Sequence, residues 1–336
     1  MKTRSVIRSV VTIIALAGAL QVAAPSPAAA QTVLKFAWQL PLTNYASKGA
    51  DRLAQCIEQK SGGSIKVETY PAGQLYRARQ LYEAARTGAI DMAMFALGSF
   101  STTDPMSDVV YLPFVVVNQE RMFQILHGDL GKFIDDIAGK ANLRVLAYFA
   151  GSGGQFGSKS RALRKPEDFK GLKIRVPGAV AAEVVKSFGG VPTTVDAAEV
   201  YLALQRGTVD GTNFPLTSFY DRKLYETIEH LTLANVSFDP DAVVIGEKAW
   251  TALPPAGRDA VKACAAEGEQ WVRDEERRLS AEYVGLLRGK GMQVIELSPE
   301  ERKVWAAAAS GIVDQFVGKH GEQARKLLDY MRAPGP

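Results

Sequence analysis

Apolar and polar residues follow two periods along the first third of the chain. Three segments alternate or are apolar as β-strands are, and two segments between them carry apolar residues at helical spacing. The strand candidates are 33–38, 65–70 and 90–96, and the helix candidates are 45–60 and 80–87. A glycine follows each helix candidate, as is typical where a helix ends. This β-α-β-α order predicts a doubly wound α/β lobe.

The same order returns in the second half. The strand candidates there are 173–176, 192–195 and 209–214, and the helix candidates are 181–188 and 197–206. Five residues at the end of the first set share their spacing with five in the second: Tyr82, Ala84, Gly88, Asp91 and Phe95 against Tyr201, Ala203, Gly207, Asp210 and Phe214. Either the chain contains a repeat, or these are chance matches within a common αβ unit. We expect both aspartates to make structural hydrogen bonds at strand starts rather than ligand contacts.

The last third is mainly helical. An irregular segment at 233–240 and a strand at 242–246 precede a long helical stretch from about 257 to 287. Its charges have mixed sign, as on a solvated helix face, and its length would reach across two lobes. A strand at 293–296 and helices at 299–318 and 322–331 complete the pattern.

One short strand places a cation where a ligand would need it. In the segment 171–177, Leu172, Ile174 and Val176 fall on one face, whereas Lys173 and Arg175 fall on the other and should point away from the core. In open α/β sheets the ligand lies beyond the carboxyl ends of the strands. A guanidinium at such an end can grip a carboxylate through two parallel hydrogen bonds, although most arginines are solvated surface residues.

The N-terminus has the pattern of a signal peptide. A basic start with Lys2, Arg4 and Arg8 precedes an apolar run from Val10 to Leu20 and an Ala-x-Ala site at 28–30. An uncleaved anchor is the alternative, but the small residues at 28–30 argue against it. We therefore expect residues 1–30 to be removed and the mature protein to lie in the periplasm.

Composition narrows the function further. The 336 residues are 47% hydrophobic and 23% charged, which fits a soluble protein of about two domains. Three of the 40 basic residues lie in the signal segment, leaving 37 against 36 acidic ones, so nucleic-acid binding has no support from charge.

Neither the cysteines nor the histidines indicate a reactive centre. Cys56 and Cys264 are either a disulfide or two buried thiols, and sequence does not decide between these. The three histidines have no metal-ligand spacing. There is no nucleophile elbow, zinc motif or phosphate-binding loop, and the glycine-rich segment 151–157 fails the dinucleotide spacing. We expect no enzyme activity, no cofactor and no metal site formed by the protein alone; the sequence does not decide whether a metal bridges the ligand and the protein. We interpret the glycine-rich segment as a crossover between domains.

The residues resemble a known family. The segments 168–176 (DFKGLKIRV) and 199–211 (EVYLALQRGTVDG), with 63–67, 71–75 and 88–92, are similar to the DctP-type solute-binding subunit of TRAP (tripartite ATP-independent periplasmic) transporters, over nearly the whole mature chain. The resemblance implies two α/β lobes of a periplasmic binding protein fold that close on an organic acid, with a long helix spanning both. We place lobe I at 31–151 plus about 241–280, and lobe II at 152–240 plus about 281–336. The resemblance implies further that Arg175 pairs with the ligand carboxylate. It also implies that the partners are a small organic acid and the TRAP permease subunits. We expect a monomer.

Two departures from the family pattern bear on the ligand. Gln155 stands where many members have a second arginine, and Phe214 stands where many have an asparagine, with Asn213 one place earlier. These changes remove a charge and add apolar surface, which favours a monocarboxylate with an apolar or aromatic body over a small dicarboxylate. Arg175 should then be the only strong charge at the site. Further wall candidates, each as easily a core residue, are Trp38, Tyr45, Phe95 and Tyr148.

Two rival functions use the same features. A periplasmic ligand sensor that docks on a receptor kinase would close in the same way, and the neighbouring genes would separate it from a transport protein. A hydrolase would need a nucleophile and base that the sequence does not show.

Overall fold

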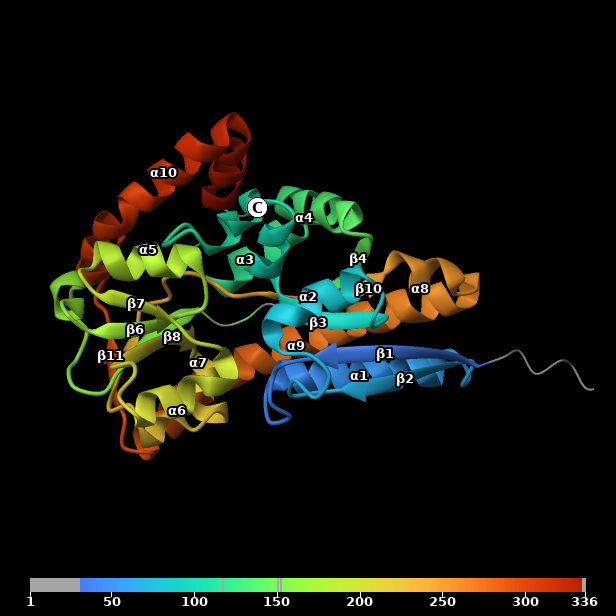
Figure 1. Ribbon diagram of the computed structural model, residues 1–336, viewed down its shortest axis with the longest axis horizontal. Helices are drawn as coiled ribbons and strands as arrows, with labels where there is room; N and C mark the ends of the chain where they lie inside the picture. Colours follow the sequence, from blue (N-terminus) through green and yellow to red (C-terminus); the bar gives the residue numbers. More distant parts are fainter. Residues whose placement is uncertain (1–30, 117, 150, 152, 334–336) are drawn as a thin grey trace, which may run out of the picture. The chain divides into compact units, whose positions relative to one another are not determined.

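The computed structural model describes residues 31–333 apart from positions 117, 150 and 152, so the predicted signal peptide lies outside the described residues. Within them, eleven strands form two sheets (Figure 1). The division into lobes I and II stays a prediction, since the chain from Gln31 onward forms one compact unit by its contacts.

The first sheet has the strand order β2-β1-β3-β10-β4. Its strands are β1 (Thr32–Trp38), β2 (Ile65–Tyr70), β3 (Met92–Ala96), β4 (Leu143–Phe149) and β10 (Asp241–Gly246). β1, β2 and β3 are parallel, and β10 inserts antiparallel between β3 and β4. The helices that follow along the chain are α1 (Tyr45–Lys60), α2 (Ala78–Arg86), α3 (Gln119–Leu126) and α4 (Asp129–Lys140).

The second sheet has the order β11-β9-β5-β8-β6-β7. Its strands are β5 (Gly154–Ser158), β6 (Lys173–Val176), β7 (Val191–Thr194), β8 (Gly211–Pro215), β9 (His230–Leu233) and β11 (Gln293–Glu296). Its helices are α5 (Ala179–Ser187), α6 (Val200–Gln205) and α7 (Leu216–Asp221). β9 was not predicted, and it ends at Leu233, where the predicted irregular segment 233–240 begins.

Three helices complete the chain: α8 (Glu247–Ala252), α9 (Pro255–Gly289) and α10 (Pro299–Arg332). Helix α9 contacts α1 and β4 of the first sheet and α7 and β11 of the second half (Figure 1), so the predicted long helix does reach both halves. Gly321 interrupts α10 with a positive φ of 70°, at the break expected between two helices. None of the helices in the described part of the chain is long and apolar enough to cross a bilayer.

The repeat seen in the sequence is a structural one. Asp91 accepts a hydrogen bond from the backbone N–H of Lys35 at 2.8 Å, and Asp210 accepts the equivalent bond from Lys173 at 2.8 Å. Each aspartate thereby joins its own αβ unit to a neighbouring strand, Asp91 to the middle of β1 and Asp210 to the start of β6. Both have the structural role that the sequence predicts.

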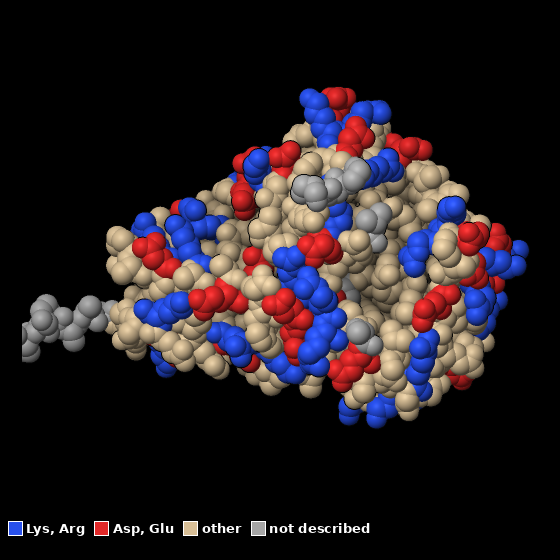
Figure 2. All heavy atoms as spheres, turned by 180° about the vertical axis from the view of Figure 1, so that it is seen from behind, with Lys and Arg blue, Asp and Glu red and all other residues tan. Residues whose placement is uncertain are grey.

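A disulfide joins α1 to α9 through Cys56 and Cys264, whose Cα atoms lie 5.6 Å apart. The two cysteines are therefore bonded to each other and are not two buried thiols, the alternative that the sequence left open. Elsewhere between these two helices, Gly49 of α1 lies so close to Val272 of α9 that a Cβ atom would overlap that side chain. Charged side chains of both signs are mixed over the surface shown in Figure 2, as the balanced composition predicts.

Candidate ligand-binding site

Arg175 lies next to the carboxyl end of β6 and is only 4% exposed. Its Nε donates to the carbonyl of Val195 at 3.0 Å and its Nη1 to the carbonyl of Asn213 at 3.1 Å. Burial, followed by the charge of Arg222, lowers the pKa of Arg175 to about 10. Leu172, Ile174 and Val176 lie in one apolar core, whereas Arg175 lies against Phe214, which belongs to another, so the predicted alternation holds although the arginine is buried.

Phe214, at the end of β8, covers the guanidinium of Arg175. The guanidinium carbon lies 4.1 Å from the centre of the ring, a cation–π contact. The ring is 6% exposed and so offers little free surface to a ligand. One face of the ring therefore contacts the Arg175 cation rather than a ligand.

Gln155 and Asn213 tie β5 to its neighbours. The amide nitrogen of Gln155 donates to Asn235 at 2.5 Å and to the carbonyl of Gly153 at 2.6 Å, and its oxygen accepts from the backbone N–H of Asn235. Asn213 donates to the carbonyl of Gln155 at 3.1 Å. These bonds connect β5 to Asn235 after β9 and to β8, which carries Phe214, and a ligand role for either amide stays a prediction.

Arg222, just after α7, is a second cation at this place, and the sequence analysis missed it. Its guanidinium carbon lies 5.5 Å from the centre of the Phe214 ring. It donates to the side chain of Gln39 at 3.2 Å and to the carbonyl of Ala197 at 3.4 Å, whereas its buried Nε finds no hydrogen-bond partner within the described residues. The prediction that Arg175 is the only strong charge was therefore wrong.

Two acids, Asp239 and Asp241, were also missed. Asp239 accepts a hydrogen bond from the Tyr111 hydroxyl at 2.7 Å. Burial raises the pKa of Asp239, and the charge of Arg175 counteracts that shift in part. Burial and the charge of Asp239 raise the pKa of Asp241 well above its usual value. We call Arg175, Phe214, Arg222, Asp239 and Asp241 the Arg175 site.

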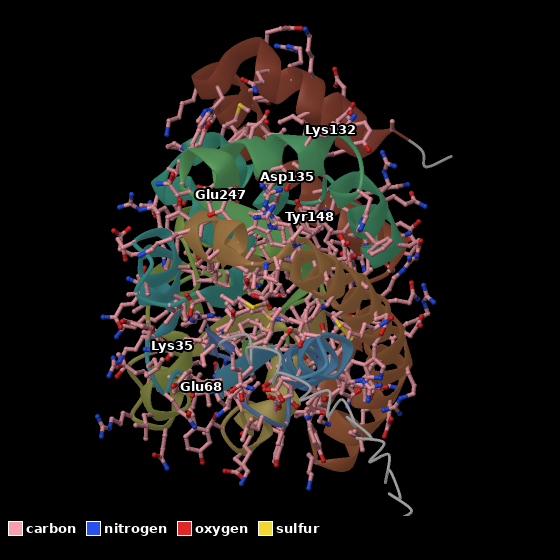
Figure 3. All side chains as sticks on the ribbon, turned by 90° about the vertical axis from the view of Figure 1, so that its right-hand side faces the viewer. Lys35, Glu68, Lys132, Asp135, Tyr148 and Glu247 are labelled. Atoms are coloured by element: carbon pink, nitrogen blue, oxygen red, sulfur yellow. A yellow bond between two sulfur atoms is a disulfide. The ribbon has the colours of Figure 1, made fainter. Side chains whose placement is uncertain are left out.

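The four aromatic wall candidates of the first sheet all lie in apolar cores. Trp38 donates to Ser47 at 2.7 Å, and Phe95 packs edge-on against Tyr82 and Phe100. Burial raises the pKa of Tyr45, with the charge of Glu276 as the next cause. Figure 3 shows Tyr148 beside Asp135, where β4 meets α4. The structure does not bring these rings to Arg175, and their contact with a ligand stays a prediction.

Metal-binding geometry is not found here. Within the described residues, no group of three or more His, Cys, Asp or Glu side chains is arranged to hold a metal ion. The Arg175 site offers two guanidinium groups and two carboxyl groups. Arg175 lies near the carboxyl end of β6 and Asp241 pairs with the carboxyl end of β3, the position that ligands occupy in open α/β folds, whereas Arg222 follows α7.

Two α/β sheets connected by a long helix, with charged groups at their strand ends, define a periplasmic binding protein. Residues 36–320 match the DctP family, bacterial extracellular solute-binding protein family 7, and the chain belongs to that family. The fold, the TRAP resemblance, the periplasmic location and the absence of an enzymatic role predicted from the sequence are thereby confirmed.

Three relatives illustrate the match. The C4-dicarboxylate-binding periplasmic protein DctP of Rhodobacter capsulatus is 28% identical over 327 residues, 96% of this chain and 97% of that protein. The sialic acid-binding periplasmic protein SiaP of Vibrio cholerae is 31% identical over 281 residues, 82% of this chain and 86% of that protein. A TRAP periplasmic solute-binding protein of Sulfurospirillum deleyianum with bound succinate superposes with a TM-score of 0.84 at 26% identity, covering 90% of this chain and 99% of that one.

Proposed function

We propose that this protein binds an organic acid with one carboxylate and an apolar body, and delivers it to a TRAP permease. The carboxylate would meet Arg175. The observation that carries this proposal is a buried guanidinium that makes no ion pair with any described residue. A buried cation is costly unless an anion compensates it, so an arriving carboxylate is favoured over a neutral solute.

The relatives support an organic acid as the ligand, but they do not indicate which acid it is. Those named for C4-dicarboxylates and sialic acid, and the structure with succinate, all involve ligands that carry a carboxylate. All of these ligands have at least one carboxylate. Arg175, whose charge is not compensated by a carboxylate of the described residues, could bind that shared group.

The choice between one and two carboxylates rests on the surroundings of Arg175. Gln155 is neutral and its amide is already bonded to Asn235, so it supplies no second cation. Asp239 and Asp241 are acids and add no cation that would hold a second carboxylate. Arg222 favours the second candidate, a small dicarboxylate, because it adds a cation close to Phe214.

A competition experiment separates the two. A thermal-shift screen over organic acids identifies binders, since a ligand of the native state raises the melting temperature. Titration calorimetry then compares the best aromatic or apolar monocarboxylate with succinate and malate. Tight binding of succinate or malate with no binding of an aromatic or apolar acid would refute the proposed ligand class while leaving the carboxylate anchor intact.

The ligand would act by favouring a closed state of the protein, because only there do groups from both halves contact it. The groups that would take part include Arg175 from the second sheet and Asp241, which starts β10 in the first. Delivery to a permease would then depend on recognition of that state.

A further inference from the structure

Helix α10 connects the two halves of the molecule a second time, in addition to α9. Gly321 divides it into a proximal arm, residues 299–320, and a distal arm, residues 322–332. The proximal arm starts on the core of the second sheet, beside α5, and the distal arm ends beside α3 and α4 of the first half (Figure 1). A helix that is attached to both halves resists their separation, because one of its attachments has to be released first.

The attachment of α10 to the second half is built around Trp305. Its side chain is fully buried against the rings of Phe169 and Phe188, at centroid distances of 5.3 and 5.1 Å. The indole N–H of Trp305 donates to the carbonyl of Arg164 at 2.8 Å, so the polar end of the ring is satisfied as well. Because large buried aromatic side chains dominate the packing around them, this end of the helix stays in place.

The attachment of α10 to the first half ends at Arg121 of α3. This side chain is buried, and its guanidinium donates to the carbonyls of Tyr330 at 2.5 Å and Met331 at 3.4 Å. Both carbonyls belong to the last turn of α10, where a helix leaves such groups without partners of its own. A cation at this end is also favoured by the helix dipole. Arg121 therefore clamps the end of the distal arm onto α3.

Gly321 makes the bend that brings the distal arm to Arg121. Its backbone has φ 70° and ψ −149°, a combination that is essentially restricted to glycine. Grooves flank the distal arm on two sides. One of about 400 Å³ lies between the two arms, with Val317 and Leu328 in its lining, and one of about 280 Å³ lies between the distal arm and α4. The distal arm thus packs less completely than the region of Trp305, which makes it the attachment that opens first.

We propose that α10 is a strap that limits the separation of the two halves, and that release of its distal arm from α3 and α4 is the step that lets them move apart. The bend at Gly321 and the clamp at Arg121 set how often this release occurs. The inference goes beyond the proposed function, because it concerns the protein without ligand and holds for any class of ligand.

Two variants weaken the strap without removing it. Arg121→Met keeps a long apolar side chain but removes the donors of the clamp, and Gly321→Ala makes the backbone of the bend unfavourable although nothing lies within 4 Å of the new Cβ atom. The matched control is Gly318→Ala, three residues earlier in the same helix, where the Cβ position is equally open and the backbone is helical.

Hydrogen exchange and a distance measurement follow the two parts of the proposal on the mature, ligand-free protein. In the parent, amides of the distal arm should exchange faster than those around Trp305. Both variants should speed exchange in the distal arm about tenfold or more, the range expected when hydrogen bonds to a charged group are lost. Spin labels at Arg79→Cys of α2 and Gln205→Cys of α6, two exposed positions in different halves, should show a larger long-distance population in both variants. The control should leave both measurements unchanged.

Three results would overturn the strap. The first is exchange in the distal arm of the parent that is as slow as around Trp305, a result that needs no variant to fold. The second is an unchanged distance distribution in either variant when circular dichroism shows that variant to be folded. The third is a change in Gly318→Ala as large as that in Gly321→Ala. Faster exchange together with longer distances in both variants and not in the control would support the inference. Since no ligand is present, none of these results bears on the proposed organic acid.

Discussion

Glu276 of α9 gives the most quantitative test of the packing between the long helix and its neighbours. Its side chain is fully buried, Ser280 donates to its Oε1 at 2.9 Å, and its Oε2 has no hydrogen-bond partner among the described residues. Burial raises the pKa of Glu276 from 4.5 to about 7, and hydrogen bonds from Ser280 and Gln119 oppose that shift. The ionised side chain is therefore unfavourable in the folded protein.

The sign of the pH dependence follows directly. Below pH 4.5 the carboxyl group is protonated in both the folded and the unfolded chain, so it costs no stability. Between pH 4.5 and 7 the folded protein keeps a proton that the unfolded chain releases, and stability falls as the pH rises. The pKa of Glu276 rises from 4.5 in the unfolded chain to about 7 in the folded protein. At 1.36 kcal/mol per pH unit, this shift lowers the free energy of unfolding by about 3 kcal/mol above pH 7.

Glu276→Gln removes the ionisation and keeps the shape. The variant should be more stable than the parent by about 2 to 3 kcal/mol at pH 8, and this gain should vanish near pH 4.5. Differential scanning calorimetry from pH 4.5 to 8.5 measures it as the difference in melting temperature between variant and parent, which cancels the titration of other buried acids. Glu282→Gln, an exposed acid of the same helix, is the control and should leave the difference near zero at every pH. A difference for Glu276→Gln that does not change with pH would refute the reasoning.

Two further predictions concern the contact between α1 and α9. Reduction of the disulfide between Cys56 and Cys264, which are 208 residues apart, should lower the free energy of unfolding by up to about 5 kcal/mol, measured by denaturation with and without reductant; an unchanged midpoint under conditions where free thiols are detected would contradict it. Gly49→Ala should destabilise the protein by about 1 to 3 kcal/mol because the new methyl group overlaps α9. Gly285→Ala, in α9 and with nothing within 4 Å of its Cβ position, should stabilise the protein by up to about 1 kcal/mol. Chemical denaturation measures both variants, and a change of the same sign in both would contradict this prediction.

Local periodicity predicted most of the elements because their stabilising contacts are encoded nearby in the chain. The break at Gly321 and the strand-start bonds of Asp91 and Asp210 follow from glycine conformation and short-range spacing. β9 was missed because it is four residues long and merges into an irregular segment. Pairing of Cys56 with Cys264 needed the distance between two helices, which no local pattern supplies.

The site was less predictable than the fold. The family motif located Arg175, but the contact that covers its guanidinium was not predicted, because the ring of Phe214 comes from another strand. Arg222 and the acids Asp239 and Asp241 lie outside any motif. The sequence signal for Asp239 and Asp241 was that two acids flank a proline in an otherwise apolar segment. Whether they belong to the site depends on where they lie relative to Arg175, which only the fold determines.

The central claim is that Arg175 holds a ligand carboxylate, and titration calorimetry of two variants tests it most directly. Arg175→Ala and Arg175→Lys should each lose about 100-fold or more in affinity for the acid that binds the parent protein most tightly, the second because an ammonium lacks the two-pronged geometry of a guanidinium. Circular dichroism and the melting temperature establish that each variant remains folded. Unchanged affinity in folded Arg175→Ala would remove Arg175 from the binding site and contradict the account.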